Sequence, residues 1–206
     1  MATKLIKKIK FEYTITLVTG LHIGGSSDNV EIGGVDLPVI KVATKEGQPY
    51  IPGSSLKGKM RCLLEQVAGA KLGENETVNK LFGFAKNNIP SRIIVRDAYL
   101  TRESADNLIH ANLDMPYTEN KYENTIDRIK GVAEHPRQIE RVPAGAKFAA
   151  EIILNIWDDD NEKQQIELLK KGISLIENDY LGGSGSRGYG QVKIEQVGNS
   201  IAYGNA

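Results

Sequence analysis

Polar and apolar residues alternate in two long stretches of the chain. Residues 9–17 place an apolar side chain at every second position, with lysine, glutamate or threonine between them, and residues 148–156 repeat the alternation. A period of two is typical of a strand with one buried face. The segments SRIIVRDAYL (91–100) and GQVKIEQV (190–197) predict two further strands.

Two other stretches show the helical period. Apolar residues recur three or four positions apart in 56–67 and in 166–176, and LGGSG ends the second stretch. Strand, helix, strand, polar insertion, strand, helix and strand then follow one another. This order predicts an α+β fold with helices packed on one face of a mainly antiparallel sheet, in a ferredoxin-like arrangement.

Composition narrows the function mainly by what it excludes. The 206 residues are 40% hydrophobic, and 26 basic residues balance 26 acidic ones, so any anion-binding site must come from local clusters. Cys62 is the single cysteine, which excludes an intrachain disulfide, and its apolar neighbours predict a buried thiol. No stretch resembles a signal peptide or a membrane span, so we expect a cytoplasmic protein with no membrane partner.

The segment IPGSSLKGKMR nearly matches a nucleotide-binding loop. Gly53, Gly58 and Lys59 fit the pattern G-x-x-x-x-G-K, but Met60 stands where a P-loop has a magnesium-binding hydroxyl. The helical period begins at Leu56, so we expect a helix that starts near the two serines and is capped by one of them. Nucleotide hydrolysis is therefore disfavoured. An ordinary capped helix and an anion site are equally compatible with this segment, and the anion site would comprise Ser54, Ser55, Lys57, Lys59 and Arg61.

A second anion-friendly segment is GGSGSRGYGQV, which starts at Gly182. Its glycines allow the backbone to approach a phosphate or a base closely, its arginine can pair with phosphate, and its tyrosine offers a stacking face. Such a loop on its own is more often a flexible connection. Two loops suited to bind anions in one domain favour a polyanion as the ligand. The residues of this loop are Gly182, Gly183, Ser184, Gly185, Ser186, Arg187, Gly188 and Tyr189.

A third segment leaves the first strand and carries carboxylates. His22 stands at its entrance, followed by Asp28, Glu31 and Asp36. Carboxylates of this kind can ligate magnesium or orient a hydroxyl for attack on phosphorus, although an aspartate before Leu-Pro can equally shape a turn. The histidines of the chain lack the spacing of a zinc site.

Taken together, six motifs resemble one family over most of the chain and in the same order. They are GLHIGG, IGGVDLPVIK, PYIPGSSLKGKMR, YTENKYENTIDRI, PRQIERVP and DYLGGSGSRGYGQV. The chain resembles the backbone subunit of type III-A CRISPR effectors, the Csm complexes, within the repeat-associated RAMP superfamily. This resemblance implies one domain over 1–206, a ferredoxin-like palm related to RNA-recognition folds, and an inserted thumb β-hairpin at about 115–143.

The resemblance also implies partners and a reaction. Copies of the chain are expected to stack head to tail along the CRISPR RNA (crRNA) and to cut complementary single-stranded target RNA at regular intervals. The other expected partners are a large polymerase-like subunit, a small helical subunit and a subunit that caps the 5′ end of the crRNA.

The resemblance also implies functional roles for the residues of this chain that match the family's motifs. Asp36 is the expected catalytic residue and a ligand of a divalent metal, Mg²⁺ by expectation, whereas His22 is expected to position RNA. The helix start, the glycine-rich loop and the inserted thumb are expected to contact RNA, the thumb through Thr125, Arg128 and Arg137.

Two alternatives remain open. One is a metal-independent crRNA-processing endoribonuclease of the same superfamily, for which His22 is the candidate general base. The other is a scaffold that coats crRNA without cutting, in which Asp36 only shapes a turn.

Overall fold

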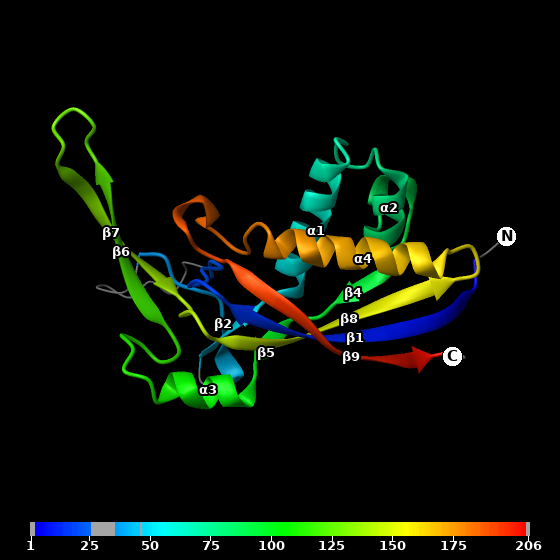
Figure 1. The fold of residues 1–206 in the computed structure, drawn as a ribbon, viewed down its shortest axis with the longest axis horizontal. Coiled ribbons are helices and arrows are strands. Elements are labelled where there is room, and N and C mark those ends of the chain that lie inside the picture. Colours follow the sequence, from blue (N-terminus) through cyan, green and yellow to red (C-terminus); the bar gives the residue numbers. More distant parts are fainter. Residues whose placement is uncertain (1–2, 26–35, 46, 205–206) are drawn as a thin grey trace.

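The computed structural model describes residues 3–25, 36–45 and 47–204, and its centre is an antiparallel sheet. The long strands are β1 (Leu5–Leu17), β8 (Lys147–Trp157) and β9 (Val192–Tyr203). Strand β1 lies between β8 and β9, paired with both along most of its length (Figure 1). The strands predicted at 9–17 and 148–156 are confirmed, and the one predicted at 190–197 is the first half of β9.

Four short strands extend the sheet beyond β8. They are β2 (Lys41–Val42), β3 (Gln48–Ile51), β4 (Ile93–Val95) and β5 (Ala98–Leu100). The order is β2-β3-β5-β8-β1-β9, and β4 also pairs with β8. The prediction of a single strand over 91–100 is therefore wrong, because Arg96 and Asp97 separate β4 from β5. The Asp97 carboxylate turns away to accept a hydrogen bond of 2.8 Å from the backbone N–H of Gly53.

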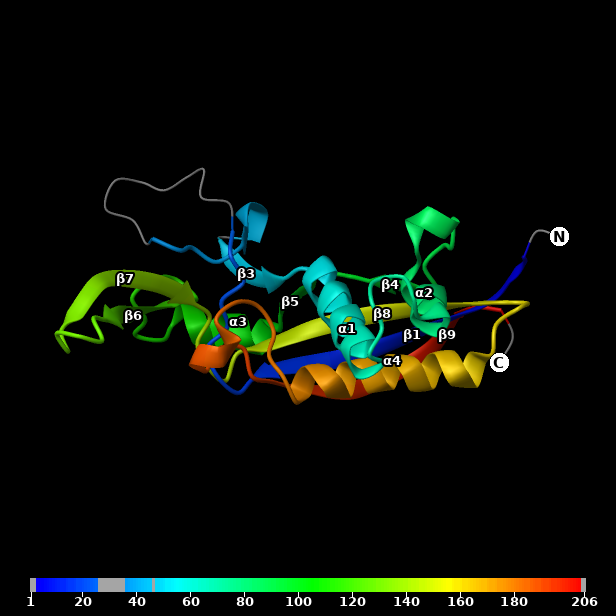
Figure 2. The ribbon, with the colours of Figure 1, turned by 90° about the horizontal axis from the view of Figure 1, so that it is seen from above.

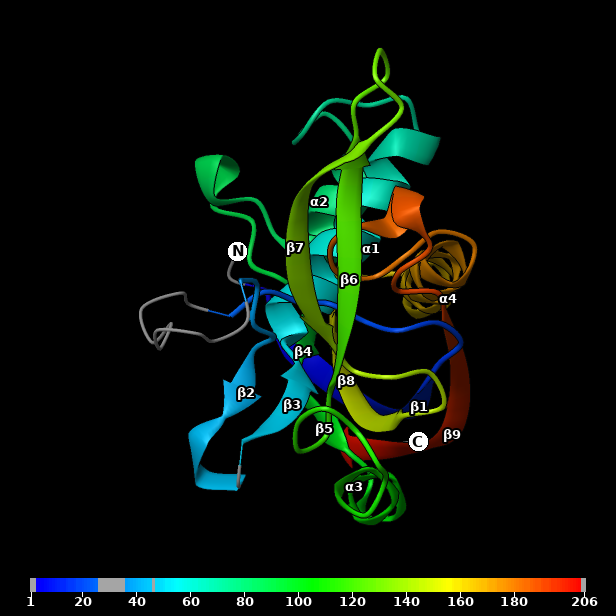
Figure 3. The same ribbon diagram turned by 90° about the vertical axis from the view of Figure 1, so that its left-hand side faces the viewer.

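The two predicted helices are confirmed, and two shorter ones accompany them. The α-helices are α1 (Gly53–Val67), α2 (Glu76–Phe82), α3 (Arg102–Ile109) and α4 (Glu162–Glu177), with short 3₁₀ helices at Ala43–Lys45, Ala85–Asn87 and Gly185–Arg187. Figure 3 shows α1, α2 and α4 on one side of the sheet and α3 on the other, so the predicted ferredoxin-like α+β class is confirmed. None of the helices in the described ranges has the length and apolar character needed to cross a membrane.

The core fills the space between the sheet and the covering helices. Phe148 and Leu154 of β8 are fully buried, and Met60 of α1 and Leu169 of α4 are 1% exposed. These side chains come from every second position of the strand and from one face of each helix. The apolar face of the sheet and the apolar faces of the helices therefore pack together in a single core.

Helix α1 differs from its prediction at its start and on its outer face. Its N-cap is Pro52, with no side-chain cap, so Ser54 and Ser55 lie inside the first turn. Proline holds a φ of −59° at the N-cap, and the Asp97 carboxylate accepts a hydrogen bond from the N–H of Gly53, the first residue of the helix. The predicted burial of Cys62 is also wrong, since this thiol lies on the exposed side of the helix.

A two-stranded hairpin projects from the sheet. Its strands are β6 (Glu119–Ile126) and β7 (Ala133–Arg141), which lie within the insertion expected at about 115–143. Figures 1 and 2 show this hairpin, hereafter the thumb hairpin, at the end of the molecule opposite the two chain termini. Asp127 closes the tip by accepting hydrogen bonds from the N–H groups of Ile129 and Lys130.

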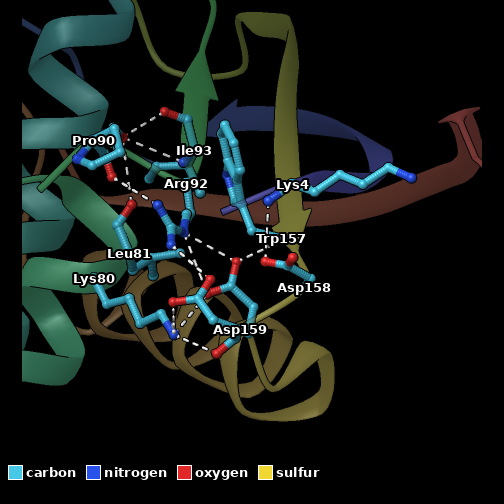
Figure 4. Close-up of polar contacts among 11 residues, drawn as sticks. Lys4, Lys80, Leu81, Pro90, Arg92, Ile93, Trp157, Asp158 and Asp159 are labelled. Carbon is cyan, nitrogen blue, oxygen red and sulfur yellow. Dashed lines mark hydrogen bonds and ion pairs between the residues drawn. The ribbon is translucent and has the colours of Figure 1, made fainter. Parts of the chain in front are cut away.

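A buried ion network holds the other end of the molecule together (Figure 4). The Arg92 side chain is 5% exposed and pairs with the fully buried Asp160 carboxylate at 3.0 Å, while Lys80 of α2 reaches Asp160 at 2.9 Å. The Arg92 guanidinium also lies 5.3 Å from the centre of the Trp157 ring. These contacts fasten the turn between β8 and α4 to α2 and to the start of β4.

We expect Arg92→Ala to lower the free energy of unfolding by about 3–5 kcal/mol, because it removes the buried one of the two cations that pair with the Asp160 carboxylate and leaves Lys80 to balance that charge. Denaturant unfolding of the purified chain measures this loss. Arg102→Ala is the matched control, since that side chain is 95% exposed and lies 4.0 Å from Asp106. Equal effects of the two substitutions would contradict the assignment of Arg92 to the stability of this end.

Candidate functional site

Asp36 lies at the base of the thumb hairpin. Its side chain is exposed, and its Oδ2 accepts a hydrogen bond of 2.9 Å from the backbone N–H of Gln138 in β7. The next residue, Leu37, forms a parallel bridge with Ile139. The hairpin therefore fixes the position of an accessible carboxylate, which can act on a ligand that binds beside it.

The buried carboxylate of Glu140 ties this segment to the rest of the molecule. Its two oxygens accept hydrogen bonds from the backbone N–H of Val39 at 2.9 Å and from the hydroxyl of Thr118 at 2.6 Å. The ammonium of Lys41 pairs with the same carboxylate at 2.5 Å. Because Val39 and Lys41 follow Asp36 closely, Glu140 sets the path of the chain on which Asp36 stands. No local pattern in the sequence marks this role of Glu140.

His22 joins the thumb hairpin to the glycine-rich loop. Its ring is buried, with Nδ1 2.7 Å from the carbonyl oxygen of Glu140, and its own carbonyl oxygen accepts a 2.8 Å hydrogen bond from the N–H of Gly183. The histidine thus lies between two of the segments that the sequence analysis expects to contact RNA. Its contacts are those of a residue that positions others.

The glycine-rich loop has a defined shape. Gly190 donates its N–H to the carbonyl oxygen of Gly20 at 3.0 Å, which returns the end of the loop to the end of β1. Gly182 has a φ of +77°, and a Cβ at this position would overlap the carbonyl oxygen of His22. A side chain larger than hydrogen would therefore separate the loop from His22.

One acidic side chain joins the glycine-rich loop to the thumb hairpin. The Oε2 of Glu123 lies 3.1 Å from Nε of Arg187 and 3.2 Å from a guanidinium nitrogen of Arg137. Two of the predicted RNA-contacting arginines, far apart in the sequence, therefore meet on one carboxylate.

Tyr189 does not offer the stacking face that the sequence predicts. Its side chain is 1% exposed, and its ring lies near the ammonium of Lys121 at 4.3 Å and the guanidinium of Arg141 at 5.3 Å. Burial raises the pKa of the Tyr189 hydroxyl to about 12, and the neighbouring Glu123 carboxylate adds to this effect. The prediction of an exposed stacking ring is wrong, because the ring packs against Lys121 and Arg141 of the thumb hairpin, and the RNA-contacting role of Tyr189 stays a prediction.

The cations of α1 point to separate partners. Lys57 donates to the hydroxyl of Ser91 at 2.8 Å, and burial together with the nearby Arg61 lowers the pKa of Lys57. Arg61 donates to Glu65, to Asn79 of α2, and to the carbonyl oxygen of Gly83 just after α2 at 2.8 Å. Lys57 and Arg61 therefore contact different parts of the fold in the free chain, and the phosphate clamp expected at this helix start stays a prediction.

Lys59 is the member of that group which comes near the glycine-rich loop. It pairs with Asp179 at 2.7 Å and lies 3.6 Å from the centre of the Tyr180 ring, on which Gly185 packs. Ser54 is exposed in the first turn of the helix, and Thr125 and Arg128 are exposed near the tip of the thumb hairpin. The RNA-contacting roles of these residues stay predictions.

The metal expected at Asp36 stays a prediction as well. No group of three or more histidine, cysteine, aspartate or glutamate side chains within 3–25, 36–45 and 47–204 forms a ready-made metal site. Asp28 and Glu31, the candidate helpers of Asp36, lie outside the described residues. An exposed carboxylate is chemically suited to Mg²⁺, which keeps several waters and needs few protein ligands.

Comparison with known proteins identifies the family. A model of the RAMP superfamily matches residues 14–193. A Streptococcus thermophilus protein named CRISPR system Cms endoribonuclease Csm3 is 46% identical over 96% of this chain and 92% of its own length. A Methanocaldococcus jannaschii protein of the same name is 44% identical over 92% of this chain and 79% of its own.

Solved structures agree with this result. The crystal structure of a Csm3-Csm4 subcomplex of the type III-A CRISPR-Cas interference complex contains a chain that is 32% identical, with a TM-score of 0.58 over 93% of this chain and 77% of that one. A chain of the type III-B Cmr-beta complex bound to cognate target RNA is 19% identical, with a TM-score of 0.66 over 95% of this chain and 61% of that one, and it shows the shared fold. The chain belongs to the RAMP superfamily and, within it, to the Csm3 family of CRISPR endoribonucleases.

We expect Glu140→Ala to lower the free energy of unfolding by about 2–4 kcal/mol, because the Val39 N–H and the Thr118 hydroxyl lose a buried acceptor. Glu140→Gln keeps an acceptor oxygen and is expected to lose less. Thermal and denaturant unfolding of the chain measure both losses. Glu134→Ala removes an exposed carboxylate of the same strand, 3.8 Å from Lys130, and a loss as large as that of Glu140→Ala would contradict the assigned role.

Proposed function

We propose that the chain binds crRNA as the repeating backbone subunit of a type III-A CRISPR effector and cuts complementary RNA through Asp36 with a divalent metal. The observation that carries this proposal is the position of Asp36. It stands exposed at the base of the thumb hairpin, on a segment fixed by Glu140, whose carbonyl oxygen lies 2.7 Å from His22 Nδ1. The proposed place of action is the cytoplasm.

The relatives support the proposed partners. The Csm3-Csm4 subcomplex joins a protein similar to this chain with another subunit, and a chain of the same fold occurs in an effector bound to target RNA. We extend this to crRNA, target RNA, further copies of the chain and the remaining Csm subunits. Copies that associate head to tail through unlike surfaces form an open filament, which suits a linear guide.

Binding through the RNA backbone suits a subunit that must accept any guide sequence. The partly exposed guanidinium of Arg187 in the glycine-rich loop can pair with a phosphate, and such a contact carries no sequence information. Sequence recognition is then left to base pairing between the guide and its target.

In the proposed reaction a 2′-hydroxyl loses its proton and its oxygen attacks the adjacent phosphorus, while the bond from phosphorus to the 5′-oxygen of the next nucleotide breaks and that oxygen takes up a proton. A carboxylate can take that proton directly, or it can hold a metal ion that lowers the pKa of the hydroxyl and neutralises charge on the phosphate. Asp36 is exposed and held from one side by the Gln138 N–H, which leaves it accessible to either arrangement.

The metal-independent alternative assigns the proton transfer to His22. The burial of this ring and its contact with the Glu140 carbonyl oxygen favour a positioning role instead. The scaffold alternative has one observation in its favour, because Asp36 does make a structural hydrogen bond. A useful variant must therefore keep that bond and remove the charge.

We expect Asp36→Asn to reduce cleavage of labelled complementary RNA by the guide-loaded complex at least ~100-fold while target binding persists. The amide oxygen still accepts from the Gln138 N–H, so the base of the thumb hairpin keeps its shape. Cleavage by the wild-type complex is expected to require Mg²⁺ and to stop in EDTA.

The matched control is Asp114→Asn, because Asp114 accepts a 2.8 Å hydrogen bond from the backbone N–H of Asn120 on the other strand of the same hairpin. Undiminished cutting by Asp36→Asn would favour the scaffold or the His22 mechanism. Cutting that continues in EDTA would point to the metal-independent mechanism through His22.

A further inference from the structure

Glu123 is an acidic residue placed among the cations that the proposed function assigns to RNA. Its side chain is 11% exposed, and its Oε2 alone serves both Arg137 and Arg187. The Lys121 ammonium lies 3.7 Å from the other oxygen. One carboxylate thus neutralises cations from both strands of the thumb hairpin and from the glycine-rich loop.

The contact adds an ion pair to the packing of Lys121 and Arg141 on the Tyr189 ring, which also joins the thumb hairpin to the glycine-rich loop. Arg187 is the basic residue of the glycine-rich loop, and its guanidinium also bonds the hydroxyl of Ser184 at 2.5 Å, which holds it in place. Arg137 and Arg187 are 43% and 48% exposed, so both guanidinium groups also face the surroundings. The arrangement is an accessible pair of guanidinium groups with an anion between them.

Carboxylate and phosphate oxygens are interchangeable partners for such a pair. Both accept charge-assisted hydrogen bonds from guanidinium groups with similar geometry. Burial alone would raise the pKa of Glu123, but the neighbouring Tyr189 hydroxyl and the cations of Arg137, Arg187 and Lys121 hold it below its usual range, so this carboxylate stays charged at neutral pH. An RNA phosphate that approaches Arg137 and Arg187 therefore meets a competing negative charge.

We propose that Glu123 stands in for an RNA phosphate in the free chain and must be displaced from Arg137 and Arg187 when RNA binds. This inference rests on the proposed RNA-binding function and adds a competing anion to it. Its consequence is that the free subunit binds RNA less tightly than its cations allow. A phosphate that also makes other contacts to the protein can displace Glu123 from the two arginines. A phosphate that meets only these arginines cannot.

Glu119 provides a matched control on the same strand and face. It pairs with Arg141 at 2.7 Å, so removing its charge also frees an arginine at the base of the hairpin. Arg141 lies against Tyr189 rather than in the accessible pair. Like Glu123→Gln, Glu119→Gln removes one negative charge from the thumb hairpin. It leaves Glu123 bound to Arg137 and Arg187, where the phosphate is proposed to bind.

The experiment measures the affinity of the purified full-length chain for a labelled unstructured single-stranded RNA at several salt concentrations. The variants are Glu123→Gln, Glu119→Gln, Arg187→Ala and the double variant Glu123→Gln with Arg187→Ala. We expect Glu123→Gln to bind roughly threefold to tenfold more tightly than wild type and Glu119→Gln to bind nearly as wild type. Arg187→Ala is expected to weaken binding more in the Glu123→Gln background than in the wild type, because only there is Arg187 free before binding.

The outcomes separate the two proposals. Unchanged or weaker binding by Glu123→Gln, with unchanged thermal unfolding, would overturn the stand-in role while leaving RNA binding by the wild type intact. An equal gain from Glu119→Gln would assign the effect to net charge and would also overturn it. If Glu123→Gln does not fold, Glu123→Ala replaces it, alone and combined with Arg187→Ala, and equal losses on Arg187→Ala with and without the glutamate would contradict the competition. Absence of RNA binding by every variant would count against the proposed function itself.

Discussion

The candidate site depends on one buried carboxylate. Glu140 lies in the thumb hairpin, yet its side chain accepts from Val39 and Thr118, and its carbonyl oxygen meets the His22 ring. Separating these segments would leave the donors that bond Glu140 buried without partners. This cost keeps the segments in fixed positions relative to one another. This explains how an exposed aspartate on a segment with little regular structure can hold a fixed place relative to the hairpin and the glycine-rich loop.

The rest of the fold supplies a rigid base for that arrangement. Strand β1 is paired on both sides, and the glycine-rich loop returns to its end through hydrogen bonds at Gly20 and His22. The opposite end of the sheet is closed by the buried pair of Arg92 and Asp160. Strong buried interactions therefore lie at both ends, whereas the contacts expected to exchange with RNA, such as that of Arg187 with Glu123, are partly exposed.

Sequence reasoning succeeded where a residue's role follows from its local pattern. The alternation at 9–17 and 148–156 and the helical period at 56–67 and 166–176 predicted the long strands and both main helices, because burial imposes those periods on any sequence. It failed where a distant partner decides the outcome. The break between β4 and β5, the cap of α1 and the direction of Arg61 all depend on side chains far away in the sequence, such as Asp97 and Asn79. The burial of Tyr189 has the same kind of cause.

The sequence by itself determined the fold class, the family and the segments expected to meet RNA, since these are carried by periodicity and by contiguous motifs. The tertiary structure decided which of their residues meet. It brought His22 to the glycine-rich loop, Asp36 to the thumb hairpin, and two distant arginines to Glu123. Hydrogen bonds and ion pairs act over a few ångströms in space without regard to distance along the chain, so only the folded arrangement could select these partners.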